Sequence, residues 1–504
     1  MYQEVPWTAQ ADFPILGVLQ LLPLAMTVLI ALLRRSLPIF PLGLAGAVAE
    51  LLLALELWNR FDHRQAAFQF AERYPILGSF QYQAAVDGMA VLFILLCAFL
   101  TLIVILYNLA AHPSKPPAHS MILIFTVEAA LMSQFATVDL MWYALASGVQ
   151  LILVGGLQWD LVTSSPEKGR ALARYLIFMT VSTVLLLAGA VLLGWNHDQA
   201  AGGWSFGLAE LSRVTIQPQI SSLVFFLIFY ALAIRIPLFP LHGWLPLTAE
   251  HGTLVVAPVF LLGLKTGIYG LLRFVFPLMK DAVVQWHGFV VGIAVAGVFY
   301  AAVLALMETN LRRLLAFAVI SHTGIMAVGL FSLGHTAFQG GVLLAANFGL
   351  AITGLLITSS FVYVRTGTML LTRLGGLFDT LPVIGTAFLI AGFSTIGMPG
   401  TPSFDGVHLV LEAAIGRFGA LVTIPTALGN VAAAGFLLRA FQRAFLSPRP
   451  AEETEPLRPP ALLERFIALS VILVLLITGF HSEPWMELTE KSLEGLGALY
   501  GGHP

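Results

Sequence analysis

Charged side chains are scarce in this chain. Asp, Glu, Lys and Arg together make up 10% of its 504 residues, against roughly a quarter in an ordinary soluble protein. With 58% hydrophobic residues and a mean hydropathy of +0.89, a water-soluble fold would have to expose mostly apolar side chains. The net charge of −2 provides no basic surface for nucleic acid. The composition excludes a water-soluble enzyme, a nucleic-acid-binding protein and a disordered scaffold.

Cysteine is also almost missing. The single one, Cys97, lies within an apolar run, so it forms no internal disulfide and no cysteine-rich metal site. The histidines show no paired haem-ligand pattern, and HExxH, P-loop and dinucleotide-binding motifs are absent from the sequence. No loop is long enough to form a soluble catalytic domain. We therefore expect no cofactor in this chain, and we expect its energy source to be another chain or an ion gradient.

Long apolar runs are what the sequence has in abundance. Runs of about 20 apolar residues suit helices that span a bilayer, and these runs are too uniformly apolar for the strands of a membrane barrel. We predict an all-α polytopic membrane protein with about fourteen transmembrane helices and a single membrane domain over 1–504. The predicted spans are 14–33, 38–58, 89–109, 120–138, 140–158, 174–195, 219–239, 254–276, 287–307, 313–333, 337–364, 383–415, 418–445 and 465–482.

Lysine and arginine predict the orientation of the bundle, because they gather in cytoplasmic loops. With the N-terminus outside, 15 of them fall in inner loops and 7 on the outer side. Both termini are then expected on the outer side of a bacterial inner membrane or a thylakoid membrane. Residues 59–87 and 196–217 are expected at the outer interface, and the Pro- and Glu-rich segment 446–464 is expected to be a cytoplasmic linker before the last helix.

Lys265 is the first residue that is costly to place in lipid. It lies near the middle of the eighth span, and a charge at the bilayer centre costs about 2.5–3.5 kcal/mol on insertion scales. Small residues surround it, which lets a neighbouring helix or water approach. Because desolvation makes a lysine easier to deprotonate, we predict a protonatable relay site. The alternative is a lysine whose ammonium reaches an interface; Arg273, two turns later, is expected to do so.

Two predicted spans contain helix breaks. Pro237, Pro240 and Pro246 follow Arg235 and flank His242, and so many prolines cannot continue one helix. A broken helix beside a buried cation and a histidine is typical of ion paths. Because arginine does not deprotonate in proteins, Arg235 is predicted to tune a neighbouring proton site without carrying the proton.

The second break lies around Pro399 and Pro402 in the twelfth span. Asp405, His408 and Glu412 follow it at i, i+3 and i+7, so they share one helix face. They are candidates for an acid–histidine–acid relay. The alternative is that Asp405 caps the second half-helix and the other two meet the outer interface.

Two further polar residues fall in the middle of predicted spans. Glu128 lies in the fourth span and His322 in the tenth. A lone buried histidine is more often a packed, hydrogen-bonded residue than a functional one. Here Asn347 and several Ser and Thr side chains in nearby spans favour a hydrated polar seam. Glu50 and Glu56 of the second span are expected at the interface.

Several motifs, in this order along the chain, resemble those of a known family. They match the antiporter-like membrane subunits of respiratory complex I and its relatives, of the NuoM/NdhD type. The matching stretches are Val86-Asp87-Gly88, Pro237-Leu-Phe-Pro-Leu-His-Gly-Trp-Leu-Pro246, Gly263-Leu-Lys-Thr-Gly-Ile-Tyr-Gly270 continuing to Phe274, Leu311-Arg-Arg-Leu-Leu-Ala-Phe-Ala-Val-Ile-Ser-His-Thr-Gly324, Leu374-Gly-Gly-Leu377 and Gly397-Met-Pro-Gly-Thr401.

The resemblance implies two inverted five-helix repeats, here 120–276 and 287–445, with broken helices 7 and 12. Residues 1–110 would then form peripheral N-terminal helices, and 446–504 the linker and last helix. It also implies that Lys265 is the central relay lysine, that His322 belongs to a water-filled path, and that Arg235 stands where the family has its pump lysine.

The sequence departs from the family at the pump residues. The fifth-helix Trp-Glu of the family falls on Ser147-Gly148, so the carboxylate is missing. The helix-twelve glutamate falls near Val407, and the helix-eleven histidine falls on Asn347. Glu128 is the candidate replacement partner for Arg235. These changes predict that the usual lysine–glutamate switch is disabled, while a route through Lys265 and His322 is retained.

Three functions fit these residues. The first is a proton-translocating membrane subunit of a complex I-like NADH or ferredoxin:quinone oxidoreductase, with flavin and Fe–S centres held by partner subunits. The second is the proton-coupled membrane subunit of an inorganic-carbon uptake complex, paired with a zinc protein resembling carbonic anhydrase. The third is a structural membrane subunit that no longer conducts. All three imply other membrane subunits as partners.

Overall fold

The structure is a computed structural model of the chain. It describes residue 5 and residues 13–34, 38–77, 80–111, 118–159, 166–251, 265–449 and 457–501. Two predicted segments lie partly outside these ranges: residues 254–264 of the eighth span and residues 450–456 of the linker.

Helices long and apolar enough to cross a bilayer dominate the fold. Within the described ranges there are eleven of them. They are α1 (Ile15–Leu33), α2 (Ile39–Arg60), α3 (Gly88–Ala111), α4 (Ala118–Ala136), α6 (Pro166–Ala201), α8 (Pro218–Arg235), α12 (Lys280–Met307), α13 (Leu311–Leu330), α14 (His335–Thr366), α18 (Ala420–Phe441) and α19 (Leu462–Phe480). This confirms a polytopic helical membrane protein, whereas the count of fourteen spans and the repeats stay predictions.

Burial separates the inner helices from the outer ones. Nearly every side chain of α13 and α14 is buried. In contrast, α1, α2, α18 and α19 expose large apolar side chains such as Leu32 and Leu421. Helices satisfy their own backbone hydrogen bonds, so apolar side chains can face lipid without cost. The outer helices are therefore the lipid-facing or partner-facing surface of the bundle.

Both predicted helix breaks are present. Helix α8 ends at Arg235, and the chain turns through 236–244 before the short helix α9 (Leu245–His251). In the twelfth span, α16 (Pro382–Thr395) and α17 (Ser403–Phe418) are separated by a turn in which Gly397 and Gly400 have positive φ. Prolines in both turns cannot donate backbone hydrogen bonds, which explains why neither helix continues.

Further helices belong to the described chain. Two of them, α5 (Leu140–Trp159) and the stretch 265–270 with its continuation, belong to predicted spans. The continuation is a π-helical turn, η1 (Leu271–Val275), followed by α11 (Phe276–Leu278). The remaining short elements are α7 (Leu208–Leu211), α15 (Leu377–Thr380) and the π-helical turn η2 (Gln442–Leu446).

Two elements were not predicted from the sequence: a β-hairpin within the interface segment 59–87, and a helix after the last predicted span. Residues 69–86 form an antiparallel hairpin of β1 (Gln69–Leu77) and β2 (Phe80–Val86), in which Tyr74 pairs with Tyr82. After α19, a further amphipathic helix, α20 (Glu483–Ala498), packs on α3 and α14. In α20, Trp485 stacks on Trp58 of α2 with ring centroids 5.4 Å apart.

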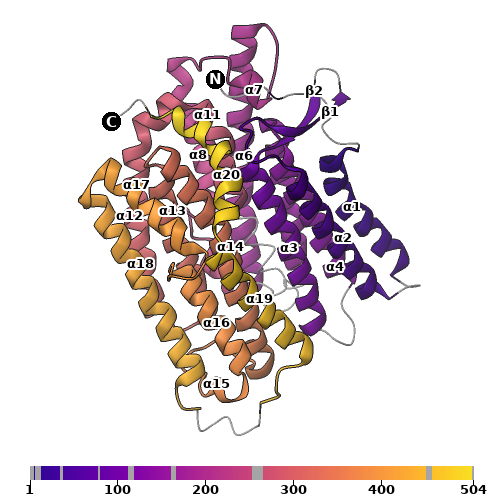
Figure 1. Cartoon of the computed structure of the whole chain (residues 1–504), viewed down its shortest axis with the longest axis vertical. Helices are drawn as coiled ribbons and strands as arrows, with labels where there is room; N and C mark the ends of the chain where they lie inside the picture. Colours follow the sequence, from indigo (N-terminus) through magenta and orange to yellow (C-terminus); the bar gives the residue numbers. More distant parts are fainter. Residues whose placement is uncertain are drawn as a thin grey trace.

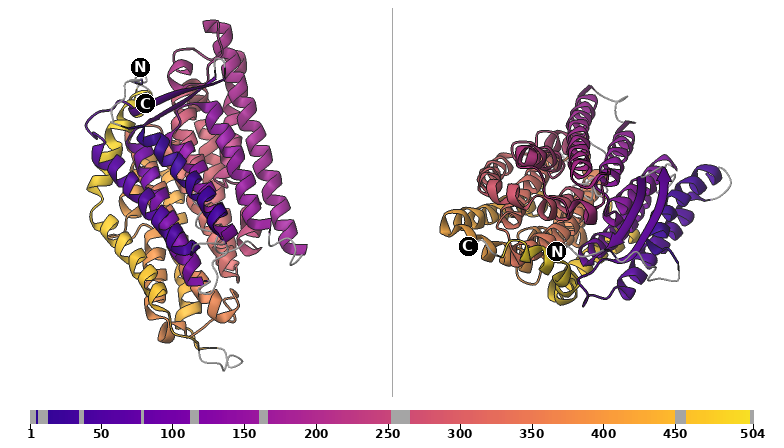
Figure 2. Two further views of the ribbon diagram at one scale, coloured as in Figure 1. Left: turned by 90° about the vertical axis from the view of Figure 1, so that its right-hand side faces the viewer. Right: turned by 90° about the horizontal axis from the view of Figure 1, so that it is seen from above.

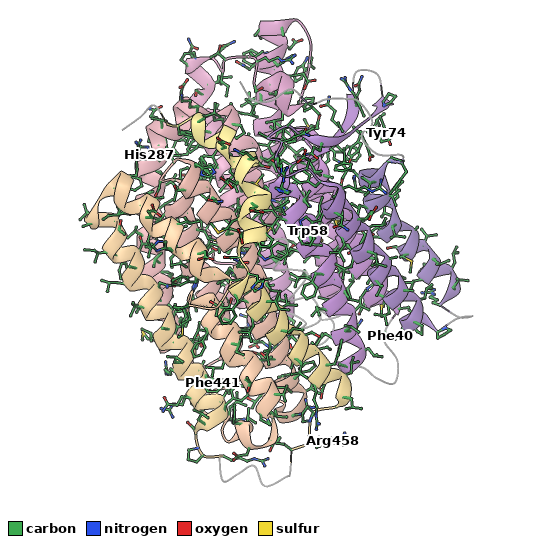
Figure 3. All side chains as sticks on the ribbon, in the orientation of Figure 1. Phe40, Trp58, Tyr74, His287, Phe441 and Arg458 are labelled. Atoms are coloured by element: carbon green, nitrogen blue, oxygen red, sulfur yellow. The ribbon has the colours of Figure 1, made fainter. Side chains whose placement is uncertain are left out.

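The helices run roughly along the long axis of the molecule (Figure 1). Helices α1, α2 and α4 form one flank, α12 and α18 form the other, and α13 and α14 lie between them (Figure 1 and Figure 2). Tyr74 marks the hairpin end, and Arg458 marks the opposite end (Figure 3).

The first and last described helices meet the same end of the bundle. The Leu16 backbone N–H, at the start of α1, donates to Glu72 of the hairpin, and the Gly88 N–H, just after β2, donates to Ser492 of α20. This agrees with an even number of membrane crossings. The side of the membrane on which this end lies stays a prediction.

Candidate functional site

Lys265 lies deep inside the bundle. Its side chain is 4% exposed, and its Nζ atom lies 4.8 Å from the centre of the Phe348 ring of α14. Among the described residues, no carboxylate forms an ion pair with this ammonium group. The face of an aromatic ring attracts a cation, so Phe348 is the contact that holds the buried ammonium.

His322 of α13 is buried against the same ring. Its imidazole stacks on Phe348 with centroids 4.7 Å apart, and Nδ1 lies 3.0 Å from the Ala318 carbonyl oxygen. The Nε2 atom faces the backbone of Thr395, at the end of α16, without a well-aligned hydrogen bond. Phe348 therefore joins the two residues that the sequence singles out, Lys265 and His322.

Sequence reasoning missed Phe348. The chain has 36 phenylalanines, and in a membrane bundle a phenylalanine is an ordinary packing residue. Its place directly after Asn347, which falls on the family's helix-eleven histidine, was the only available signal.

Arg235 is the last residue of α8 and lies beside the eighth span. It is 4% exposed, and its Nη2 atom donates a 3.0 Å hydrogen bond to the Thr183 hydroxyl of α6. Its Nε atom has no hydrogen-bond partner among the described residues. The Arg235 Cβ atom packs against Gly267, two residues after Lys265. Two buried tyrosines, Tyr143 and Tyr175, are the titratable groups that interact with it electrostatically.

Neutral side chains occupy the fifth-helix region where the resemblance described above implies a glutamate. Ser147 donates to the Gln134 side-chain oxygen (3.0 Å), and the Gln134 amide donates to Gln150 (2.9 Å). All three are buried. Because glutamine and serine do not titrate, this network satisfies its own polar groups without a charge. Sequence reasoning missed Gln134 and Gln150, since it looked for ionisable groups.

Gly148 explains why no counter-charge reaches Arg235 from α5. A Cβ atom on Gly148 would lie 3.2 Å from the Thr183 methyl group, and the Thr183 hydroxyl accepts the Arg235 hydrogen bond. A side chain at position 148 would thus enter the surroundings of Arg235. With glycine there, a hydroxyl takes the place of a carboxylate beside the arginine.

Glu128 does not replace that carboxylate, and this prediction was wrong. Its electrostatic partner is Glu50 of α2, and Glu128 is absent from the groups that interact with Arg235. Glu50 itself is fully buried, so its expected place at the interface was also wrong. The two carboxylates belong to the N-terminal helices α2 and α4.

The twelfth-span residues face outward. Asp405 is half-buried and both His408 and Glu412 are exposed on α17, so the structure does not bring them to the Lys265–His322 pair. Asn347 is closer to the break, since its amide donates to the Pro402 carbonyl. His242, in the turn after α8, is 8% exposed and stacks between Phe239 and Tyr300.

Arg273 is buried, contrary to its expected place at an interface. It donates two hydrogen bonds to Asp87, of 2.8 and 2.6 Å, and its side chain is fully inaccessible. Such a bidentate pair satisfies both charges geometrically. Asp87 also accepts from the Ala90 N–H at the start of α3. The pair connects the hairpin end of α3 to the continuation of the Lys265 segment.

A polar cavity of about 670 Å³ lies where α6, α9 and α13 approach one another. Glu250 of α9 lines it together with Arg313 and His251. The Glu250 carboxylate lies 3.2 Å from Arg313, and its carbonyl accepts a hydrogen bond from Arg312. Charged side chains therefore line a cavity at the end of α9, the short helix that follows the break.

Comparison with known proteins places these features in a family. Residues 138–428 match the family described as NADH:quinone oxidoreductase/Mrp antiporter, transmembrane. NADH-quinone oxidoreductase subunit M of Escherichia coli K12 is 29% identical over 326 residues. That alignment covers 64% of this chain and 64% of the E. coli subunit, which is slightly less than two thirds of that relative.

Solved structures extend the similarity to nearly the whole chain. A chain of respiratory complex I from Thermus thermophilus with bound NADH is 28% identical, with a TM-score of 0.85, and the match covers 97% of this chain and 100% of that one. A chain of the Mrp complex from Dietzia sp. DQ12-45-1b has a TM-score of 0.85 at 19% identity, covering 96% and 98%. The latter likeness concerns the fold alone.

Proposed function

Because the chain belongs to the NADH:quinone oxidoreductase/Mrp antiporter transmembrane family, we propose that it translocates protons as one membrane subunit of a complex I-like assembly. The observation that carries the proposal is the buried contact of Lys265 and His322 with one ring, Phe348. Two groups that exchange protons lie in the middle of the bundle, next to a broken helix on either side. Its partners are the other membrane subunits of such an assembly.

The surroundings of Lys265 suit a relay. A buried ammonium paired with a carboxylate holds its proton tightly, because the ion pair stabilises the charged form. Lys265 has an aromatic face instead, which stabilises the charge by only about 0.5–2 kcal/mol. The His322 Nε2 atom, with no well-aligned partner, is available to exchange a proton through water. Protons therefore pass along the Lys265–His322 axis in this proposal.

Arg235 has a different part in the same proposal. A guanidinium stays charged, so Arg235 does not receive a proton. The neutral Gln134–Ser147–Gln150 network offers Arg235 no carboxylate. Conduction in this proposal then depends on Lys265 and His322, with the cavity at Glu250 and Arg313 as the route to water.

Lys265→Ala tests the proposal in the native complex reconstituted into vesicles. We expect proton uptake, followed with a pH-sensitive dye, to fall to near background while the complex stays assembled. His322→Ala should reduce it as well. The control is Lys280→Ala, which removes a lysine at the start of α12. Wild-type transport in a Lys265→Ala/His322→Ala double variant would overturn the proposal and favour a structural subunit.

The type of assembly is tested separately by mass spectrometry of the gently solubilised native complex. Partners with flavin and Fe–S centres support the oxidoreductase, as the family description suggests. A zinc-containing partner resembling carbonic anhydrase would support the inorganic-carbon complex, which stays a prediction from the sequence.

A further inference from the structure

Two glutamates face each other inside the N-terminal helices. Gly43 of α2 packs against Met121 of α4. Helices α2 and α4 run in the same direction, because α3 returns between them. Seven residues further along each helix, two turns on and on the same face, lie Glu50 and Glu128. Both carboxylates therefore lie on the sides of α2 and α4 that are turned toward each other, and they interact electrostatically.

Both carboxylates are sealed from solvent. Glu50 is 0% exposed and Glu128 is 1% exposed. Their four oxygen atoms have no hydrogen-bond partner of good geometry among the described residues. Thr101 of α3 lies beside Glu128, and the Cys97 thiol lies within electrostatic range of both acids. The pair is therefore surrounded by α2, α3 and α4.

No cation balances this pair within the described parts of α1 to α4. Arg60 pairs with Glu56 at the end of α2, ten residues beyond Glu50, and His119 lies nine residues before Glu128 at the start of α4. Helix α1 contributes no titratable side chain over 15–33, and α3 contributes Cys97 and Tyr107. Two ionised carboxylates at this place would repel each other in a low dielectric, so a proton must be bound.

A further buried polar side chain lies on the same face of α3. Asn108 is 0% exposed, and neither its amide nitrogen nor its amide oxygen has a hydrogen-bond partner among the described residues. Cys97, Thr101 and Asn108 follow one another at helical spacing. They form a polar stripe from the acid pair toward the end of α3 at residue 111. The amide of Asn108 is thus a further buried polar group on this face of α3 without a partner in the described part of the chain, independent of the two acids.

We propose that Glu50 and Glu128 form a second proton-binding site, in which the two carboxyl groups share one exchangeable proton. The proton bonds to a carboxylate oxygen of one residue, is held there by the negative charge of the other, and returns to water along the Thr101–Asn108 stripe. No other bond forms or breaks. The site lies apart from Lys265, Phe348 and His322, and it stands whether or not that axis conducts.

Infrared difference spectroscopy on the reconstituted complex tests the site. A protonated carboxyl group in an apolar environment has a separate C=O stretching band, and we expect a band whose intensity falls as the pH is raised. In Glu50→Gln, the band should lose intensity and its pH midpoint should move by about one unit or more, as for coupled acids. Glu128→Gln should have the matching effect. Glu56→Gln, on the same helix, should change neither.

Several results would overturn the proposal. One is the absence of any carboxyl band that depends on Glu50 and Glu128. Another is that each single variant leaves the midpoint of the remaining acid unchanged, since the acids then do not share a proton. A midpoint that shifts when Na⁺ replaces K⁺ would indicate a cation site instead. If a glutamine variant fails to assemble, Thr101→Val supplies the same test, because it should shift the midpoint and retain the band.

The two proposals fail independently. Lys265→Ala should abolish transport and leave the carboxyl band intact. If Lys265→Ala loses transport but the wild type shows no such carboxyl band, the proposed Lys265–His322 axis stands and the proposed acid-pair site is rejected.

Discussion

The ammonium nitrogen of Lys265 lies 4.8 Å from the centre of the Phe348 ring, and that ring is stacked against His322. An aromatic ring thus takes the place of a counter-ion beside Lys265 in the middle of the bundle. A carboxylate at the same place would hold the proton more strongly and slow its release.

Replacing the ring is the first prediction. We expect Phe348→Leu to lower proton transport on the order of tenfold, because leucine offers no π face to the ammonium and no stacking surface to the imidazole. Transport by the reconstituted complex is the measurement. Phe361→Leu is the matched control, since Phe361 is equally buried on α14 and packs on Tyr107. Equal losses in both variants would mean that only packing matters.

Restoring a lysine–glutamate pair is the second prediction. Position 148 points at Thr183, the hydrogen-bond partner of Arg235. We expect the double variant Gly148→Glu/Arg235→Lys to transport protons faster than the wild type, because its lysine can release a proton and its glutamate supplies the counter-charge. Arg235→Lys alone should show no gain, and Gly148→Glu alone should form a permanent ion pair.

The control for that double variant is Gly155→Glu/Arg235→Lys. Position 155 faces Leu176 and not Thr183, so its carboxylate cannot reach residue 235. If both double variants transport alike, the placement of the carboxylate is irrelevant and our account of Arg235 fails.

Stability should depend strongly on the Arg273–Asp87 pair. Removing one partner of a buried ion pair leaves an uncompensated charge, which costs about 3–5 kcal/mol. Arg273→Met should therefore lower the melting temperature of the solubilised protein sharply. Asp87→Asn/Arg273→Met should recover part of the loss, because asparagine is neutral and still caps α3. Lys491→Gln, which breaks an exposed pair with Glu494, should have little effect. A double variant that melts as low as Arg273→Met would contradict this.

The fourth prediction concerns pH and Asp139, in the turn between α4 and α5. Burial raises the pKa of this carboxyl from its ordinary 3.8 to about 6, against hydrogen bonds from the Trp142 and Met141 backbone that lower it. As the pH rises, Asp139 loses its proton in the unfolded chain before it does so in the folded chain. The raised pKa therefore stabilises the fold fully below about pH 4. Up to about 3 kcal/mol of the free energy of unfolding is lost as the pH rises through 6.

Asp139→Asn removes this titration and retains the helix cap on Trp142. The melting temperature of the wild type should fall more steeply between about pH 4 and 6 than that of the variant. Parallel curves would show that Asp139 does not cause the dependence.

Much of the bundle follows from the sequence because lipid imposes a simple rule. A run of about 20 apolar residues must be helical, and prolines and glycines at 237–246 and 397–402 must interrupt it. Lys265 and His322 could be selected because charge and polarity are costly at those positions. The β1–β2 hairpin and α20 lack that signal, since outside the membrane short polar segments have several stable conformations.

Contacts between residues that are far apart in the sequence could not be predicted from the sequence. Arg273 and Asp87 are 186 positions apart, so Arg273 taken alone looks like an interfacial arginine. Glu50 was assigned to the interface for the same reason: burial depends on which helices pack against α2. The neutral Gln134–Ser147–Gln150 network was missed because glutamine on an apolar helix carries no charge to mark it.

The packing of α20 on α3 has a consequence for the order in which the protein folds. Gly88 approaches the Leu488 carbonyl so closely that a side chain would not fit, and its N–H is bonded to Ser492, 404 positions later. The beginning of α3 can therefore reach its final packing only after the residues around 488–492 have been synthesised. Until then, the N-terminal end of α3 lacks the helix that covers it in the folded protein.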